Sequence, residues 1–188
     1  MVFLALVILP LAVHGDSGSS KNSLQEVLAS KILAKILNGE PVEYDHVIVR
    51  GDLDLSQWRL QANVTSLIRI NDSIFDSFVN FSHTIFDNPI DMSGSNFNKD
   101  VNFSRATFIK DAKFNNATFS GTAGFFGTTF SEKADFEDAD FKGAIFAEAT
   151  FDSVTNFEGA KFSAALFFDS WFDSAARFEG AEFGFTDF

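Results

Sequence analysis

The stretch DFEDADFKGAIFAEATF, at residues 135–151, carries a phenylalanine every five residues and an alanine two residues before each of the last three. Outward from this stretch, a large apolar residue recurs every five or six positions, and all but Met92 are Phe. These positions are 75, 81, 86, 92, 97, 103, 108, 114, 119, 125, 130, 136, 141, 146, 151, 157, 162, 167, 172, 178, 183 and 188. The chain holds 26 Phe against 2 Trp and 1 Tyr. A core built from one bulky residue type implies that the same space recurs, so the sequence predicts a repeat.

The residue two positions before each of these Phe is small or β-branched, and from Ala106 to Thr186 it is Ala, Thr or Ser. Segments such as NFSRATF (102–108) and KFNNATF (113–119) show the full pattern. The pattern resembles the pentapeptide-repeat family over residues 42–188. In that family the central Phe or Leu and the small residue point inward, and four such faces close one coil. The resemblance implies an all-β fold, a right-handed quadrilateral β-helix, but it says little about function because one scaffold carries many roles.

The spacing of the core residues gives an independent argument for four sides. When the steps are sorted in a cycle of four from Phe75, one corner always takes six residues and two always take five. The remaining corner takes six residues as far as 119→125 and five from 141→146 onward. A coil with three or five sides would scatter these changes. We therefore predict four-sided coils of 22 residues early and 21 residues late.

The register continues less regularly upstream of Phe75. We assign Ile48, Leu53, Trp58, Val64 and Ile70 to the core, so that residues 42–71 form degenerate first coils. The total is then six or seven coils.

An amphipathic helix is predicted over residues 23–38. Ser23 would be its N-cap and Glu26, three residues on, would complete a capping box. Its apolar stripe is made of residues four apart: Leu24, Leu28, Ile32 and Ile36. Gly39 and Pro41 end it. A helix directly before a repeat array would cover the open apolar end of the first coil.

The first fifteen residues, MVFLALVILPLAVHG, form an apolar run that is short for a membrane span. Val13 and Gly15 suit a signal-peptidase site, but no Lys or Arg precedes the run, so an uncleaved anchor is the alternative. The predicted division is a signal peptide or anchor at 1–15, a linker and capping helix at 16–41, and the β-helix at 42–188. We expect export to the cell envelope or the extracellular space.

Charge and composition exclude several kinds of site. A net charge of −12 argues against binding the phosphate backbone of a nucleic acid, which requires clustered Lys and Arg. The absence of Cys excludes disulfides, thiolate metal sites and cysteine nucleophiles. We therefore expect no nucleic-acid partner and no cofactor.

Two groups of carboxylates are candidate binding or catalytic sites. Glu137, Glu158 and Glu179 follow the core Phe at one fixed place in successive coils. Their repulsion would recruit a hard cation such as Ca²⁺, or would be relieved by Lys161 and Arg177 nearby.

The second group is Asp135, Glu137, Asp138 and Asp140, since paired carboxylates can hydrolyse glycosides. No aromatic-lined cleft for a sugar is evident around them, however, so we predict no enzyme and no small-molecule substrate. His14 lies in the export segment, and we predict that His46 and His83 are surface or turn residues without a partner.

Five Asn-x-Ser/Thr sequons are candidate glycosylation sites in an exported protein: Asn63, Asn71, Asn80, Asn102 and Asn116. The alternative is that the repeat itself favours Asn, Ser and Thr at its turns.

Several aromatic residues fall outside the core register. Phe126 and Phe168 directly follow core residues and should point outward, as should Trp171. Phe185 and Phe188 belong to the last coil, where we expect either an end-to-end homodimer or a further segment of chain. The favoured function is a non-catalytic exported structural or protein-interaction module. The alternative is an acidic DNA mimic that binds a type II topoisomerase, as some members of the family do.

Overall fold

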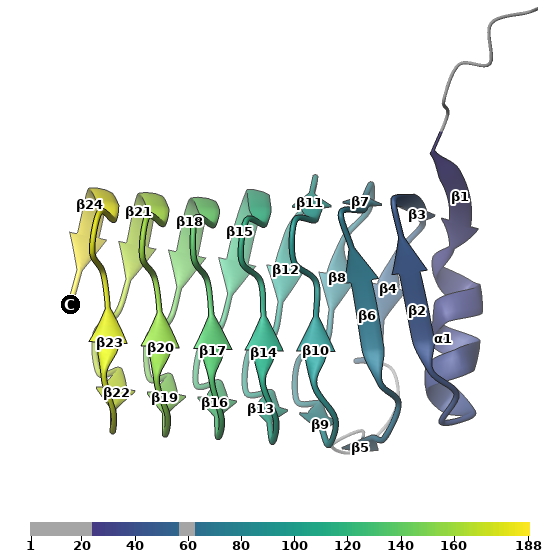
Figure 1. Ribbon diagram of the computed structural model, residues 1–188, viewed down its shortest axis with the longest axis horizontal. Helices are drawn as coiled ribbons and strands as arrows, with labels where there is room; N and C mark the ends of the chain where they lie inside the picture. The colour runs from purple at the N-terminus through teal and green to yellow at the C-terminus, as the bar shows by residue number, and fades with distance from the viewer. Residues whose placement is uncertain (1–23, 57–62) are drawn as a thin grey trace, which may run out of the picture.

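The computed structural model describes residues 24–56 and 63–188, which wind into a parallel β-solenoid (Figure 1). One face is a sheet of seven strands, so the solenoid has seven coils at this face. We call it the β2 face. Its strands are β2 (Val42–Asp45), β6 (Ile68–Asn71), β10 (Ile90–Asp91), β14 (Ala112–Lys113), β17 (Ala134–Asp135), β20 (Thr155–Asn156) and β23 (Ala176–Arg177).

A second face is a sheet of six strands, the β5 face, and each of its strands directly precedes a strand of the β2 face in the chain. Its strands are β5 (Asn63–Val64), β9 (Ile85–Phe86), β13 (Thr107–Phe108), β16 (Thr129–Phe130), β19 (Thr150–Phe151) and β22 (Trp171–Phe172).

The two remaining faces share one sheet of eleven strands. The β3 face begins with β3 (Val47–Arg50), β7 (Ile74–Phe75) and β11 (Asn96–Phe97), and the β4 face with β4 (Leu53–Asp54), β8 (Val79–Asn80) and β12 (Val101–Asn102). Longer strands then turn the corner and belong to both faces: β15 (Thr118–Gly124), β18 (Asp140–Ile145), β21 (Lys161–Leu166) and β24 (Glu182–Asp187). The predicted four sides are confirmed.

The core consists of stacked phenylalanine rings. Phe119 and Phe141, in adjacent coils, have ring centroids 4.7 Å apart and planes 2° from parallel. Rings from different faces meet edge to face instead, as Phe125 and Phe136 do at 5.5 Å and 79°. Both geometries are favoured for aromatic rings, and the strand spacing of about 4.8 Å matches the stacking distance. The inward small residues, such as Ala106, leave room for the rings and are themselves buried.

Two opposite corners of each coil are tight turns. The amide N–H of Ala106 donates to the carbonyl of Phe103 at 2.9 Å, and Arg105 between them has a φ of 57°. Asn116 has the same φ at the other corner. A type II turn requires positive φ at this position, which Gly, Asn and Asp tolerate best. Among the described residues, four of the eight non-glycine residues with positive φ are Asn or Asp: Asp72, Asn116, Asp138 and Asp169.

The corner between the β3 and β4 faces changes length as predicted. The register between β15 and β18 shifts between Phe119 and Thr122, and Thr122 then pairs with Gly143. The extra residue of the longer coil therefore lies at this corner. A Cβ on Gly121 would lie 2.7 Å from the backbone N of Asp100, so only glycine fits there without a backbone shift.

The register predicted for the first coil is partly wrong. Val49, not Ile48, pairs with Phe75, so Ile48 lies outward beside Ile74. Leu53 is buried but pairs with Val79, in the position of the small residue, and the core position belongs to Leu55. The step from Leu55 to Val64 is nine residues, so counting backward by fives loses the register.

Of the other core positions predicted upstream of Phe75, two are confirmed. Val64 pairs with Phe86, and Ile70 is fully buried on the β2 face, as predicted. Trp58 lies outside the described residues.

The predicted helix is shorter than expected. Residues Gln25–Leu28 form strand β1, which pairs in parallel with β3, and helix α1 spans Ala29–Leu37. The predicted capping box is wrong because Glu26 lies in β1 and its carboxylate binds Arg50, 2.6 Å away. Strand pairing with the first coil and this ion pair replace the helical turn.

Helix α1 lies against the first coil (Figure 1). It buries Ala29, Ile32 and Ile36, and Gly39 with a φ of 68° follows its end. The segments predicted as signal peptide or anchor and as the polar linker, with His14 and Ser23, lie outside the described residues. Across residues 24–56 and 63–188, none of the helices has the length and apolar character needed to cross a bilayer.

Candidate functional sites

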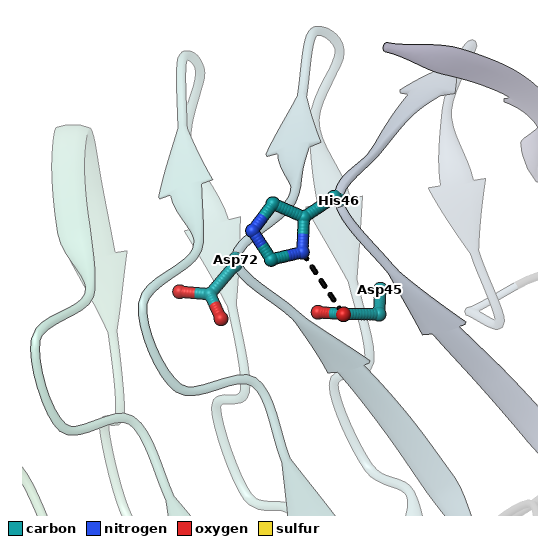
Figure 2. Close-up of side chains that lie close together, drawn as sticks. All are labelled: Asp45, His46 and Asp72. Carbon is teal, nitrogen blue, oxygen red and sulfur yellow. Dashed lines mark ion pairs between the residues drawn. The ribbon is translucent and has the colours of Figure 1, made fainter.

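Asp45, His46 and Asp72 gather at the corner after the β2 face (Figure 2). Asp45 ends β2 and Asp72 follows β6, and the pairing of these strands brings the two residues together. One oxygen of each carboxylate and one ring nitrogen lie within 4.8 Å of one another, and His46 Nδ1 is 2.9 Å from Asp45 Oδ2. The prediction that His46 has no partner is therefore wrong.

The two carboxylates of this cluster favour the charged form of His46. The hydrogen bond and charge of Asp45 raise the pKa of His46, and Asp72 adds to the effect. The raised pKa favours the protonated imidazole, and this proton competes with a metal ion for the ring nitrogen. An ion pair this exposed contributes little to stability. All three side chains are exposed. The only sign of this cluster in the sequence is that Asp45 and His46 are adjacent. The nearness of Asp72 depends on the register between β2 and β6, which the sequence does not show.

The column Glu137, Glu158 and Glu179 lies on the same side of the rod but does not converge. Asn156 donates to Glu137 Oε2 at 3.2 Å, and Arg177 lies 3.9 Å from Glu158 Oε1. Within the described ranges, one group of three His, Asp or Glu side chains is close enough to share an ion, and it consists of Asp45, His46 and Asp72. The glutamate column stays a prediction as a cation site.

The acidic cluster around Asp135 is divided by the fold. Asp135 is 8% exposed, and its carboxylate binds Lys133 at 2.8 Å and Asn156 at 3.3 Å. Asp138 occupies the turn with a φ of 53°, and Asp140 begins β18 on a different face. The four carboxylates therefore do not face one another across a cleft.

Charge alternates across the β2 face. Its outward residues in successive strands are Glu43, Arg69, Asp91, Lys113, Asp135, Asn156 and Arg177. Opposite charges on neighbouring strands stabilise a sheet, and Arg69 lies 3.6 Å from Glu43. This face is therefore not a continuous acidic surface.

The five sequon asparagines differ in exposure. Asn63 and Asn116 are exposed, whereas Asn71, Asn80 and Asn102 are half-buried. Asn80 and Asn102 pair across β8 and β12, and their Oδ1 atoms accept hydrogen bonds from the backbone N–H groups of Ser82 and Ser104. Glycosylation of any of the five stays a prediction.

The β4 face changes character along the rod. Its first three coils read DLDLS (52–56), FVNFS (78–82) and DVNFS (100–104), and the next three read TAGFF (122–126), GAIFA (143–147) and AALFF (164–168). The second set carries no charged residue. We call its solvent-accessible outward residues, with Phe185 of the next coil, the apolar half-face: Thr122, Gly124, Phe126, Gly143, Ile145, Ala164, Leu166, Phe168 and Phe185.

The predicted interaction residues occupy three places. Phe126, Phe168 and Phe185 lie on the apolar half-face, and Arg105 lies over the ring of Phe126 at 5.9 Å. Phe168 is 38% exposed and Phe185 is 71% exposed. Trp171 lies on the β5 face, and Phe188 stacks on Phe167 with ring centroids 5.2 Å apart. Whether they bind a partner stays a prediction.

Comparison with known proteins identifies the repeat. A family model described as pentapeptide repeats matches the chain in nine copies, including residues 81–129, 103–150 and 114–161. No curated protein and no solved structure gives a significant match. The matched residues contain the stacked Phe columns and the small inward residues of the solenoid core. The chain belongs to the pentapeptide-repeat family.

Proposed function

We propose that this protein is a non-catalytic, exported module that binds protein through the apolar half-face. The observation that carries the proposal is the change on the β4 face from acidic and amide residues to three coils without charge. The central core residue of this face is Phe on both sides of the change, from Phe81 to Phe167, so the ring stack does not account for it. Exposed apolar patches that are contiguous in this way mark interaction sites on soluble proteins.

The shape of the apolar half-face suits a protein surface. A shallow depression of about 230 Å³ lies between its coils, lined by Gly143, Ile145, Ala164, Leu166 and Phe185, among others. Small residues form its floor and Phe185 stands at its edge. An apolar side chain of a partner would fill this depression, whose lining residues carry no charge. The exposed Asp187, which pairs with Leu166, borders it on the side of the next coil.

Self-association is one form of this proposal. A second copy presents the same uncharged face. Contact through the remaining surface would be opposed by repulsion between two chains that each carry a net charge of −12. Phe185 and Phe188 of the last coil offer a second, end-to-end contact.

Export is proposed on the apolar segment at residues 1–15. A role outside the cytoplasm is incompatible with a partner such as gyrase, and the alternating charges of the β2 face do not favour mimicry of DNA. We therefore give no second function.

Site-specific photo-crosslinking in the native host tests the protein contact. A photoreactive residue at Leu166 should give a defined protein adduct, because this position lies on the apolar half-face, beside Ile145 and in the lining of the depression. The same residue at Ser104, on the polar half of the same face, is the control and should give none. Adducts absent at 166, or equal at the two positions, would contradict the proposal.

A further inference from the structure

A groove lies where the β3 face turns into the β4 face, in the coils before the apolar half-face. Its volume is about 600 Å³, within the range of small-molecule sites. The residues that line it are mostly polar: Asp52, Ser77, Phe78, Val79, Asn80, Asn98, Lys99, Asp100, Asn102 and Gly121. The longer, six-residue corner of these early coils makes room for it.

Phe78 is the aromatic wall of the groove. Its side chain is 44% exposed, and the stacked core does not use it because Phe81 fills the core position of that strand. The equivalent positions in the coils on either side are Asp52 and Asp100. Asp100 Oδ1 accepts the backbone N–H of Thr122 at 2.8 Å, which fixes this carboxylate. An exposed ring therefore stands between two hydrogen-bond acceptors.

Asn80 and Asn102 supply donors to the same groove. They are partners across β8 and β12, so their side chains are about 4.8 Å apart. The backbone N–H groups of Ser82 and Ser104 occupy the Oδ1 atoms, at 3.2 and 2.9 Å. This arrangement fixes both amides and leaves their Nδ2 groups for a ligand. The next residue in the column is Gly124, which adds no side chain.

These features together fit a sugar. A pyranose ring has an apolar C–H face that packs on an aromatic ring, and hydroxyls that each donate and accept hydrogen bonds. A purely apolar ligand would leave the amides unpaired, which is costly. An anion would meet two carboxylates against the single cation of Lys99. We propose that this groove binds a neutral pyranose ring.

The bound pyranose can come from two sources. One is a free oligosaccharide. The other is a glycan attached to Asn80, because Phe78 lies two residues before Asn80 and both side chains therefore point to the same side of the strand. Asn116, exposed at a turn, has no such neighbour among the groove residues.

The first arm of the test uses unglycosylated protein from a bacterial cytoplasm and ligand-observed NMR titrations with cellotetraose, laminaritetraose and chitotetraose. We expect at least one to bind with a Kd of about 1 mM or tighter. Phe78→Ala should weaken it about tenfold, and Asn102→Ala should also weaken it. Phe168→Ala removes an exposed ring elsewhere on the same face and should leave binding unchanged. If Phe78→Ala left the affinity for the oligosaccharide unchanged, the proposal would be overturned.

The second arm uses protein from the native host. Glycopeptide mass spectrometry should find a sugar on Asn80 if the groove holds the protein's own glycan, and nuclear Overhauser contacts should join that sugar to the ring of Phe78. A sugar on Asn80 without this contact counts against the groove. No binding of the three oligosaccharides at about 10 mM together with a bare Asn80 overturns the proposal outright.

Discussion

Single residues in this protein have one of two very different roles, set by whether they face the ring stack or the solvent. A core Phe contacts rings in the coils before and after it and in neighbouring columns, so its removal leaves a cavity that close-packed neighbours cannot fill. An outward Phe lies outside the ring stack. The two kinds alternate at adjacent positions, as Phe125 and Phe126 do.

Phe119→Ala should lower the free energy of unfolding by about 3–5 kcal/mol, because Phe119 is 1% exposed and stacks between Phe97 and Phe141. Phe126→Ala should cost about 1 kcal/mol or less, because that ring is only half-buried. Urea unfolding of both variants measures the difference. Equal costs would show that the register is misassigned.

His46 should titrate above the ordinary histidine pKa, because its hydrogen bond with Asp45 favours the protonated form. The ion pair then contributes to stability below about pH 6.5, and the contribution fades as pH rises through the raised pKa. An NMR titration of the imidazole gives the value directly. Asp45→Asn should bring the pKa of His46 down, and an unchanged pKa in that variant would contradict the pairing.

At the scale of the coil, the length of each corner is set by a few residues with strict steric demands. The corner that β15 turns holds the extra residue Gly121, packed against the backbone of Lys99 and Asp100. In the next coil Gly143 lies at the same corner, and a Cβ on it would meet nothing within 4 Å. The two glycines therefore have different reasons to be there.

Gly121→Ala should destabilise the protein by about 1–3 kcal/mol, because the added methyl group overlaps backbone atoms that cannot move independently. Gly143→Ala, the matched change one coil on, should alter the free energy of unfolding by about 0.5 kcal/mol at most. Thermal and urea unfolding compare the pair. A neutral Gly121→Ala variant would mean that the corner is looser than the structure indicates.

The regular coils could be predicted from the sequence because their register depends on local spacing alone. From Phe75 to Phe188 the period of Phe and small residues was enough to assign inside, outside and four corners. The first coil could not be predicted, because nine residues separate Leu55 from Val64 and nothing local marks the longer step. Strand β1 was mistaken for helix since its apolar residues also suit a helical stripe, and only pairing with β3 decides between them.

The candidate sites were harder to predict than the coils. Phe126, Phe168 and Phe185 could be assigned to the outside from the register, but their union on one uncharged half-face needed the alignment of strands. The cluster of His46 with Asp72 and the groove around Phe78 depend on residues about one coil apart. A single sequence does not reveal which of many polar residues will meet across coils.

At the scale of the molecule, the proposed route of export predicts a processed chain. Protein recovered from the native host should begin near Asp16, because Val13 and Gly15 suit cleavage at that point. Intact-mass measurement of fractionated cells gives the answer. An unprocessed chain in the cytoplasmic fraction would contradict export and would restore the DNA-mimic alternative.

The surface of the whole rod is divided between charged and uncharged regions, and the proposed function depends on that division. The β2 face carries opposite charges in alternation, and the early β4 face carries acids and amides. The apolar half-face carries neither. Association through it should be weak, because a few coils of one face bury less area than a stable dimer requires.

Sedimentation velocity of the mature chain at concentrations up to about 100 µM tests the apolar half-face most directly. We predict reversible self-association in the micromolar range that Leu166→Asp abolishes and that Ser104→Asp, on the polar half of the same face, leaves intact. Phe188→Asp separates this contact from an end-to-end one and should have little effect. A wild-type chain that stays monomeric throughout would contradict self-association, and association that survives Leu166→Asp would contradict contact through the apolar half-face.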